Sequence, residues 1–201
     1  MQLIAKANIH EDLKIFKVEN KHGIQSIKVL KNKYDTKVYK KSEHLLEQGY
    51  EVENEHLVRF EISTSDQTQK QRLLGESMTV DGLVNNFEKI VQWFITGIRE
   101  TIKKPVERYL KSMEKECIQR LEQGVKPSVV INELMFRQDL VDLIVFDNAI
   151  RKHYKSIGKT KNVSRTIKTT HKRLKELNAG RYNQVTNNIE TLQELYDILG
   201  I

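Results

Sequence analysis

The chain has 201 residues, 38% of them hydrophobic and 30% charged, and its 34 Lys and Arg residues against 27 Asp and Glu give a formal net charge of +7. This is enough for one large domain or two small ones, and the single cysteine, Cys117, excludes intramolecular disulfides and cysteine-built metal sites. The first ten residues lack the apolar run of a signal peptide, and no segment has the hydropathy of a membrane span, so we expect a cytoplasmic protein that does not associate with membranes.

From Leu3 to Ser63 the hydrophobic pattern is typical of strands, because apolar and polar residues alternate or β-branched residues cluster. Gly23 separates two such runs and permits the positive φ of a short hairpin loop. The segment 42–50 has the pattern of a short helix that Ser42 caps and Gly49 ends. We therefore expect an antiparallel sheet in a strand-rich region over residues 1–76. The clearest strand runs are 13–18, 24–30 and 56–63.

Beyond residue 76 the hydrophobic period changes from 2 to 3.6, which predicts a helical region over residues 79–201 and hence an α+β fold. Thr79 is placed to cap the first helix, and Pro105 fits the first turn of a second helix that follows it directly. Later helices are expected over 128–157 with a break near Phe136, over 163–178, and over 185–199.

The strongest functional signal is the stretch 151–175, which contains ten Lys and Arg residues and no Asp or Glu. At 100° per residue, several of these cations fall on the side of a helix opposite Val163, Ile167, Leu174 and Leu177. Solvated helix faces usually mix both signs of charge, because like charges at i and i+4 repel. We predict that this helix contacts the phosphate backbone of DNA through Lys159, Lys161, Arg165, Lys168, Lys172, Arg173 and Lys175.

Two other interpretations of the 151–175 stretch stay open: a solvated helix face and a surface for an acidic protein partner. A second basic run at 28–41 interleaves six lysines with Tyr34 and Tyr39. Aromatic rings beside cations can stack on bases while the lysines hold phosphates, but lysines also protect exposed edge strands. Oligomeric state is not determined by these patterns, and a homo-oligomer is compatible with them.

Common enzyme signatures are missing from the chain, so we expect a protein without a cofactor, and the enzyme question leans towards no. A carboxylate-rich segment could hold a divalent ion, yet plain solvation is the more frequent role of such a segment and we expect no metal site. Cys117 falls on the apolar stripe of its helix, which indicates a core residue. The members of the carboxylate-rich segment are His44, Glu51, Glu53, Glu55, His56 and Glu61.

VYKKSE at 38–43 and HLVRFEIS at 56–63 resemble the paired strands of plasmid and filamentous-phage rolling-circle replication initiators. Tyr39 and Lys41 match the first strand, Arg59 and Glu61 match the second, and Lys40 stands where the family has aspartate. The resemblance implies a DNA-binding protein of a mobile element that acts in replication initiation or its control.

Tyr39 is either a packed strand tyrosine or a nucleophile for DNA nicking, in which case Lys41, two residues on, would lower the pKa of the phenol. The resemblance implies the nicking role, with Glu61 as a second catalytic residue and with a divalent metal. The family's histidine pair is missing from this chain. Catalysis is therefore an open alternative to simple binding. A protein of another class, such as a phage-encoded inhibitor that binds an acidic host protein, would use the same basic surface.

Overall fold

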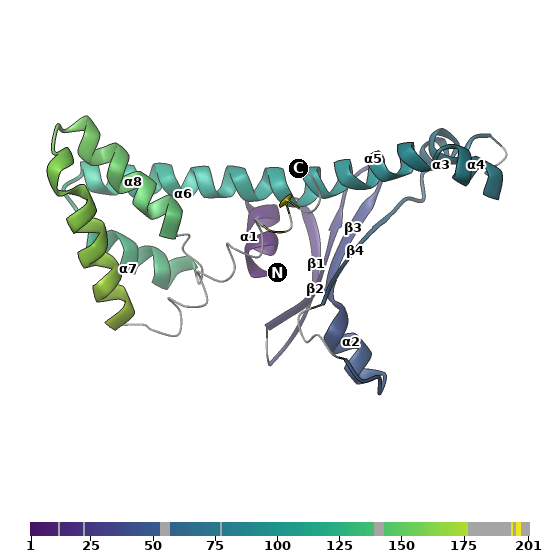
Figure 1. Ribbon diagram of the computed structural model, residues 1–201, viewed down its shortest axis with the longest axis horizontal. Coiled ribbons are helices and arrows are strands. Elements are labelled where there is room, and N and C mark those ends of the chain that lie inside the picture. Colours follow the sequence, from purple (N-terminus) through teal and green to yellow (C-terminus); the bar gives the residue numbers. More distant parts are fainter. Residues whose placement is uncertain are drawn as a thin grey trace. The chain divides into compact units, whose positions relative to one another are not determined.

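The computed structural model describes residues 1–11, 13–21, 23–52, 57–76, 78–138, 143–176, 194, 196 and 197. The chain forms two compact units, Met1–Val106 and Glu107–Ile201 (Figure 1). The first unit contains a four-stranded antiparallel sheet, and the described remainder of the chain is mainly helical. The predicted α+β class is thus confirmed. The first unit extends beyond the change of hydrophobic period near residue 76 and includes the helices that follow it.

The sheet has strand order β1-β2-β3-β4, and every neighbouring pair is antiparallel. Its strands are β1 (Lys14–Asn20), β2 (Gly23–Leu30), β3 (Asp35–Lys40) and β4 (Val58–Ser63). All three predicted strand runs are present. In the hairpin between β1 and β2, Asn20 pairs with Gly23, whose φ of 103° is the positive value expected for that glycine.

Helix α1 (Gln2–His10) replaces the strand expected at the start of the chain, so the prediction of strands from Leu3 was wrong. Leu3, Ile4 and Ala7 are buried, and their i, i+1, i+4 spacing places them on one face of a helix. The helix expected over 42–50 is α2 (Lys41–Glu47). Its N-cap is Lys40, because Ser42 is buried inside the first turn and does not cap it.

The inner face of the sheet packs against helices of its own unit (Figure 1). These are α1, α5 (Phe87–Ile98) and the π-helical turn η1 (Arg99–Lys103). Two shorter helices, α3 (Gln67–Leu74) and α4 (Val80–Asn85), connect β4 to α5. Thr79 caps α4 as predicted, since its Oγ1 accepts a hydrogen bond from the Gly82 amide at 3.2 Å. Ile27, Val29 and Val38 of the sheet are almost fully buried.

The π-helical turn η1 ends next to α6 (Lys104–Glu122), whose second residue is Pro105. Proline has no N–H and its ring crowds the carbonyl four residues earlier, which is that of Thr101. The buried Asn8 of α1 supplies a donor instead, because its Nδ2 lies 2.9 Å from the Thr101 carbonyl oxygen. The first-turn position predicted for Pro105 is correct. The π turn before it was not predicted, because it involves a contact with Asn8, which is distant in sequence.

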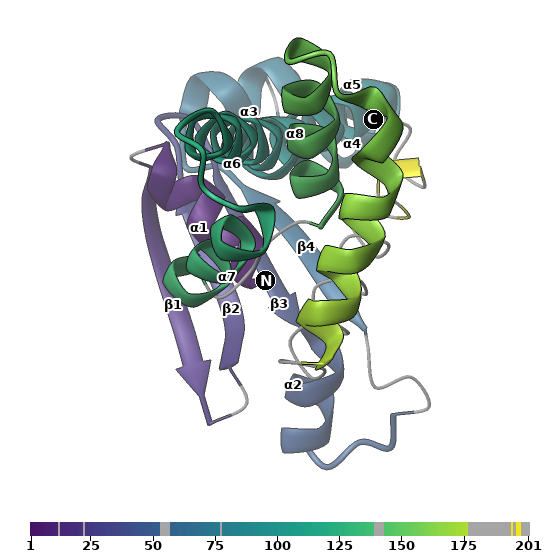
Figure 2. The ribbon, with the colours of Figure 1, turned by 90° about the vertical axis from the view of Figure 1, so that its left-hand side faces the viewer.

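The second unit contains most of α6, α7 (Pro127–Gln138), α8 (Leu143–Ser156), the 3-10 turn η2 (Thr160–Asn162) and a helix over 163–176 (Figure 2). Its core includes Ile131, Leu134, Phe146 and Ile150. The break expected near Phe136 is not there, because Phe136 lies inside α7; the residues between the end of α7 and the start of α8 lie outside the described ranges. The predicted helix over 185–199 lies outside the described residues, apart from three positions. None of the helices in the described ranges is long and apolar enough to cross a membrane.

Candidate nucleic-acid interface

The predicted basic helix is present over 163–176, and its apolar side is packed into the second unit. Val163, Ile167 and Leu174 are 7%, 8% and 2% exposed. This burial fixes the helix against the unit and leaves the charged side in solvent, as its hydrophobic period predicts. Its five Lys and Arg residues are all exposed: Arg165, Lys168, Lys172, Arg173 and Lys175.

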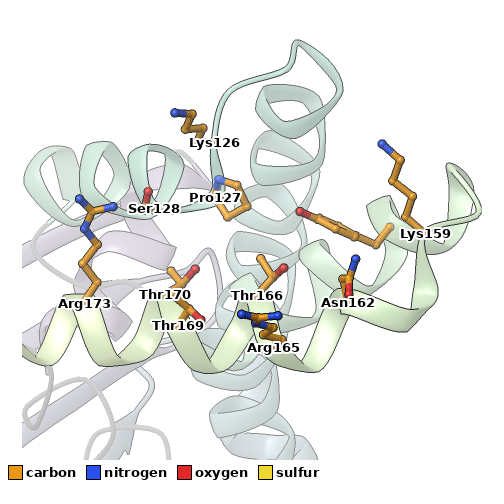
Figure 3. A pocket seen from close by; sticks show the side chains of 11 residues that line it. Lys126, Pro127, Ser128, Lys159, Asn162, Arg165, Thr166, Thr169, Thr170 and Arg173 are labelled. Carbon is orange, nitrogen blue, oxygen red and sulfur yellow. The ribbon is translucent and has the colours of Figure 1, made fainter.

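Beside this helix lies an open groove of ≈ 570 Å³, which we call the basic groove (Figure 3). The helix 163–176 forms one side, and the beginning of α7, the end of α8 and the segment that includes Lys159 and η2 contribute the rest. Four cations line it: Lys126, Lys159, Arg165 and Arg173. No Asp or Glu is among the described residues that line it.

These four cations form no ion pair with any described carboxylate, which is also true of the exposed Lys161, Lys168 and Lys175. Lys152 on α8, by contrast, contacts Glu114 at 2.8 Å, and Lys172 lies 3.9 Å from Glu176. Unpaired cations around one concave surface raise the local electrostatic potential more than scattered surface charges do. The basic groove is therefore suited to an anionic ligand.

Hydroxyl groups lie between the cations of the basic groove. Thr166, Thr169 and Thr170 come from the helix 163–176, and Ser128 comes from the first turn of α7 (Figure 3). Hydroxyl donors and a positive helix N-terminus are both common contacts to phosphate oxygens. Tyr154 of α8 completes this polar lining. The groove thus combines charge and neutral donors.

The structure places some of the predicted DNA-contacting residues in the basic groove and others outside it. Lys159, Arg165 and Arg173 line the basic groove. Lys168 and Lys175 fall on the opposite flank of the exposed helix face, because residues advance by 100° along a helix. Lys161 of η2 and Lys172 are exposed and do not line the groove.

Sequence reasoning missed Lys126 and the groove's hydroxyl-bearing residues. Lys126 precedes Pro127, the first residue of α7, and is distant in sequence from the basic helix. A proline directly after a lysine is a detectable helix-start signal. This signal does not reveal which other helix the N-terminus of α7 lies against. The sequence therefore allows the start of α7 to be predicted, but not the position of Lys126 in the groove.

In the second basic run, 28–41, some side chains pack against helices and others lie on the outer face of the sheet. Tyr34 packs edge-on against Trp93 of α5 with ring centroids 6.2 Å apart, and burial raises the pKa of its phenol. Lys31 Nζ donates to the Glu100 carbonyl oxygen at 3.0 Å. Lys37 and Tyr39 lie instead on the outer face of the sheet, with the Lys37 ammonium 4.7 Å from the ring centroid.

The two candidate catalytic residues lie together in the sheet. Tyr39 Oη donates to Glu61 Oε1 at 2.9 Å, across the pairing of β3 with β4. Partial desolvation and this hydrogen bond raise the pKa of the Tyr39 phenol, opposite to the lowering expected from Lys41. A phenol held in this way is protonated at neutral pH, so the geometry gives no sign of an activated nucleophile.

The structure does not assemble the carboxylate-rich segment into a metal site in the ranges that it describes. Glu53, Glu55 and His56 of that segment lie outside the described residues. Cys117 is 1% exposed, and burial raises the pKa of its thiol to about 12, which agrees with the predicted core position. This thiol is a packing group in α6.

No family model, curated protein or solved structure matches this chain. The resemblance to rolling-circle replication initiators therefore stays a prediction, and the argument for function depends on the geometry of the chain itself.

Proposed function

We propose that this protein binds DNA, with the phosphate backbone lying along the basic groove. The observation that carries the proposal is the presence of four cations around one groove, Lys126, Lys159, Arg165 and Arg173, without a described carboxylate to neutralise them. A cation that has no protein partner retains its full attraction for a phosphate, and each phosphate contact releases condensed counterions. The two arginines also offer planar forks that match phosphate oxygens.

The groove has features that suit contact with the nucleic-acid backbone. Its hydroxyl groups can donate hydrogen bonds in the manner of phosphate-positioning residues. We therefore expect binding with little sequence preference at this surface. The resemblance at residues 38–63 supports placing that binding in the cytoplasm, in replication initiation of a mobile element or its control.

The test compares two double variants that change the net charge equally and lie on the same helix. Arg165→Glu with Arg173→Glu removes two groove cations, whereas Lys168→Glu with Lys175→Glu alters exposed cations on the other flank. Binding of a labelled random duplex is followed by fluorescence anisotropy from low to physiological salt. Four phosphate contacts correspond to a log–log salt slope of about −3.6, and loss of two corresponds to about −1.8.

We expect the groove variant to show the smaller slope and the flank variant to keep a slope near that of the wild type. Equal losses in both variants would mean that general charge, and not the groove, governs binding. If the wild type binds no DNA at low salt, the proposal fails. An acidic protein partner is then the alternative to pursue, by capture from host lysate with the groove variant as the negative control.

A further inference from the structure

The outer face of the sheet in the first unit carries the exposed ring of Phe16 and the half-buried ring of Tyr39 among cations. Strand pairing aligns Phe16, Lys28 and Lys37 in one cross-strand row. The next row contains Tyr39 and Arg59, which are directly opposite each other on β3 and β4. Since side chains alternate along a strand, these residues share the face opposite the buried Ile27 and Val38. We call this surface the outer sheet face.

Phe16 is 53% exposed, and its ring has the Lys14 ammonium 5.8 Å from its centroid. The Tyr39 ring has two such neighbours, Lys37 at 4.7 Å and Arg59 at 6.0 Å. Leaving a phenylalanine ring in water sacrifices the stabilisation that its burial would give. An exposed ring with a cation beside it is therefore a candidate contact for a ligand that is both aromatic and anionic.

We propose that the outer sheet face binds single-stranded nucleic acid, with bases stacking on Phe16 and Tyr39 and phosphates contacting Lys14 and Lys37. This surface lies in the first unit, whereas the basic groove lies in the second. The proposal therefore stands or falls independently of the groove. It adds a preference for unpaired strands that the groove's backbone contacts do not provide.

Charge complementarity favours a nucleic acid over an apolar protein surface. The two carboxylates of the outer sheet face are already paired, Asp35 with Lys28 at 2.9 Å and Glu61 with Arg59 at 3.0 Å. Lys14 and Lys37 form no ion pair with the described residues, so the face has unneutralised positive charge beside its rings. An apolar partner would have to desolvate these lysines without compensation.

The shape of the surface favours a single strand over a duplex. The bases of a duplex are stacked on one another and present only their edges, so they cannot lie flat on a ring. A single strand exposes the faces of its bases, and stacking on an aromatic side chain tolerates any sequence. The outer sheet face should thus discriminate by strandedness rather than by sequence.

The test uses the full chain and an oligothymidylate that contains one 2-aminopurine, whose fluorescence is quenched when it stacks. Phe16→Ala and Tyr39→Ala remove one ring each, and Phe16→Tyr and Tyr39→Phe are matched controls that keep the rings. We expect each alanine variant to lose about 5- to 150-fold in single-strand affinity and to weaken the quenching, the range measured for loss of one stacked base. Duplex affinity should stay unchanged.

Three results would overturn the proposal: full affinity and quenching in both alanine variants, equal loss in the ring-keeping controls, or equal loss of duplex binding. Thermal unfolding identifies any alanine variant that fails to fold. Lys14→Glu with Lys37→Glu then serves in its place, because both lysines are on the surface, and it should weaken single-strand binding at low salt. The groove variant Arg165→Glu with Arg173→Glu should keep the 2-aminopurine quenching when bound.

Discussion

Asn8 should stabilise the first unit by compensating for the missing amide of Pro105, and a double-mutant cycle measures this directly. Asn8 is fully buried, and its Nδ2 donates to the carbonyl oxygens of Ile4 at 2.8 Å and Thr101 at 2.9 Å. Thr101 is the residue whose carbonyl an amide at position 105 would contact in an α-helix. The cycle consists of the wild type, Asn8→Ala, Pro105→Ala and the double variant.

In the wild-type background, Asn8→Ala removes the donor to a buried carbonyl, which costs about 1–3 kcal/mol in addition to lost packing. Replacing Pro105 with alanine restores an N–H that can donate to Thr101 once the π turn relaxes. The cost of losing Asn8 should then fall by about 1 kcal/mol. The bond to Ile4 and the unpartnered, buried Asn8 Oδ1 are the same in both backgrounds, so they cancel.

Urea unfolding followed by tryptophan fluorescence gives the four free energies. Trp93 is the single tryptophan and lies in α5 against Tyr34, so its signal reports on the first unit. A fully additive cycle would refute the reasoning, because it would show that Asn8 and Pro105 act independently. A larger cost of losing Asn8 in the Pro105→Ala background would refute it equally.

Three further outcomes follow from the same structure. Gly82→Ala should lower the midpoint of thermal unfolding, because the added Cβ would overlap a backbone carbonyl of α3, even though alanine favours a helix by about 1 kcal/mol. Gly97→Ala should lower the midpoint less, because there the added Cβ meets only the flexible tip of a side chain. The free energy of unfolding should fall as the pH rises from 9 towards 12, because burial raises the pKa of the Cys117 thiol from 9.0 in the unfolded chain to about 12 in the folded protein. Thermal unfolding of Cys117→Ala, measured over the same pH range, should show a shallower decline. Lys126→Glu should weaken duplex binding and reduce the salt slope by about 1, and an unchanged slope would remove α7 from the interface.

The strands were predictable where the sequence alternates, and the misses have a physical cause. The start of the chain contains apolar residues at both strand and helix spacings, and only burial of Leu3, Ile4 and Ala7 on one face decides for a helix. Strand β3 is rich in charged and polar residues, so its hydrophobic signal is weak. It is held by pairing on both sides with β2 and β4. The π turn depends on Pro105 and a distant asparagine together.

The candidate sites were predictable to the level of the helix and the strand, but not to the level of the groove and the face. The charge pattern identified the basic helix, yet only packing shows that Arg165 and Arg173 lie with Lys126 around one hollow. Likewise, the alternation of β1 predicts which side Phe16 points to, but the strand register is needed to bring it onto the same face as Tyr39. Both sites arise from residues that are distant in sequence.

Binding at the two proposed surfaces should depend differently on salt concentration. Binding in the basic groove depends on counterion release from several phosphates, so it should fall steeply as ionic strength rises. On the outer sheet face, stacking on Phe16 and Tyr39 contributes free energy that does not depend on displaced counterions. As salt increases, duplex affinity should therefore vanish before single-strand affinity does. If both affinities fall in parallel to zero, charge alone accounts for the binding and the aromatic rings contribute nothing to it.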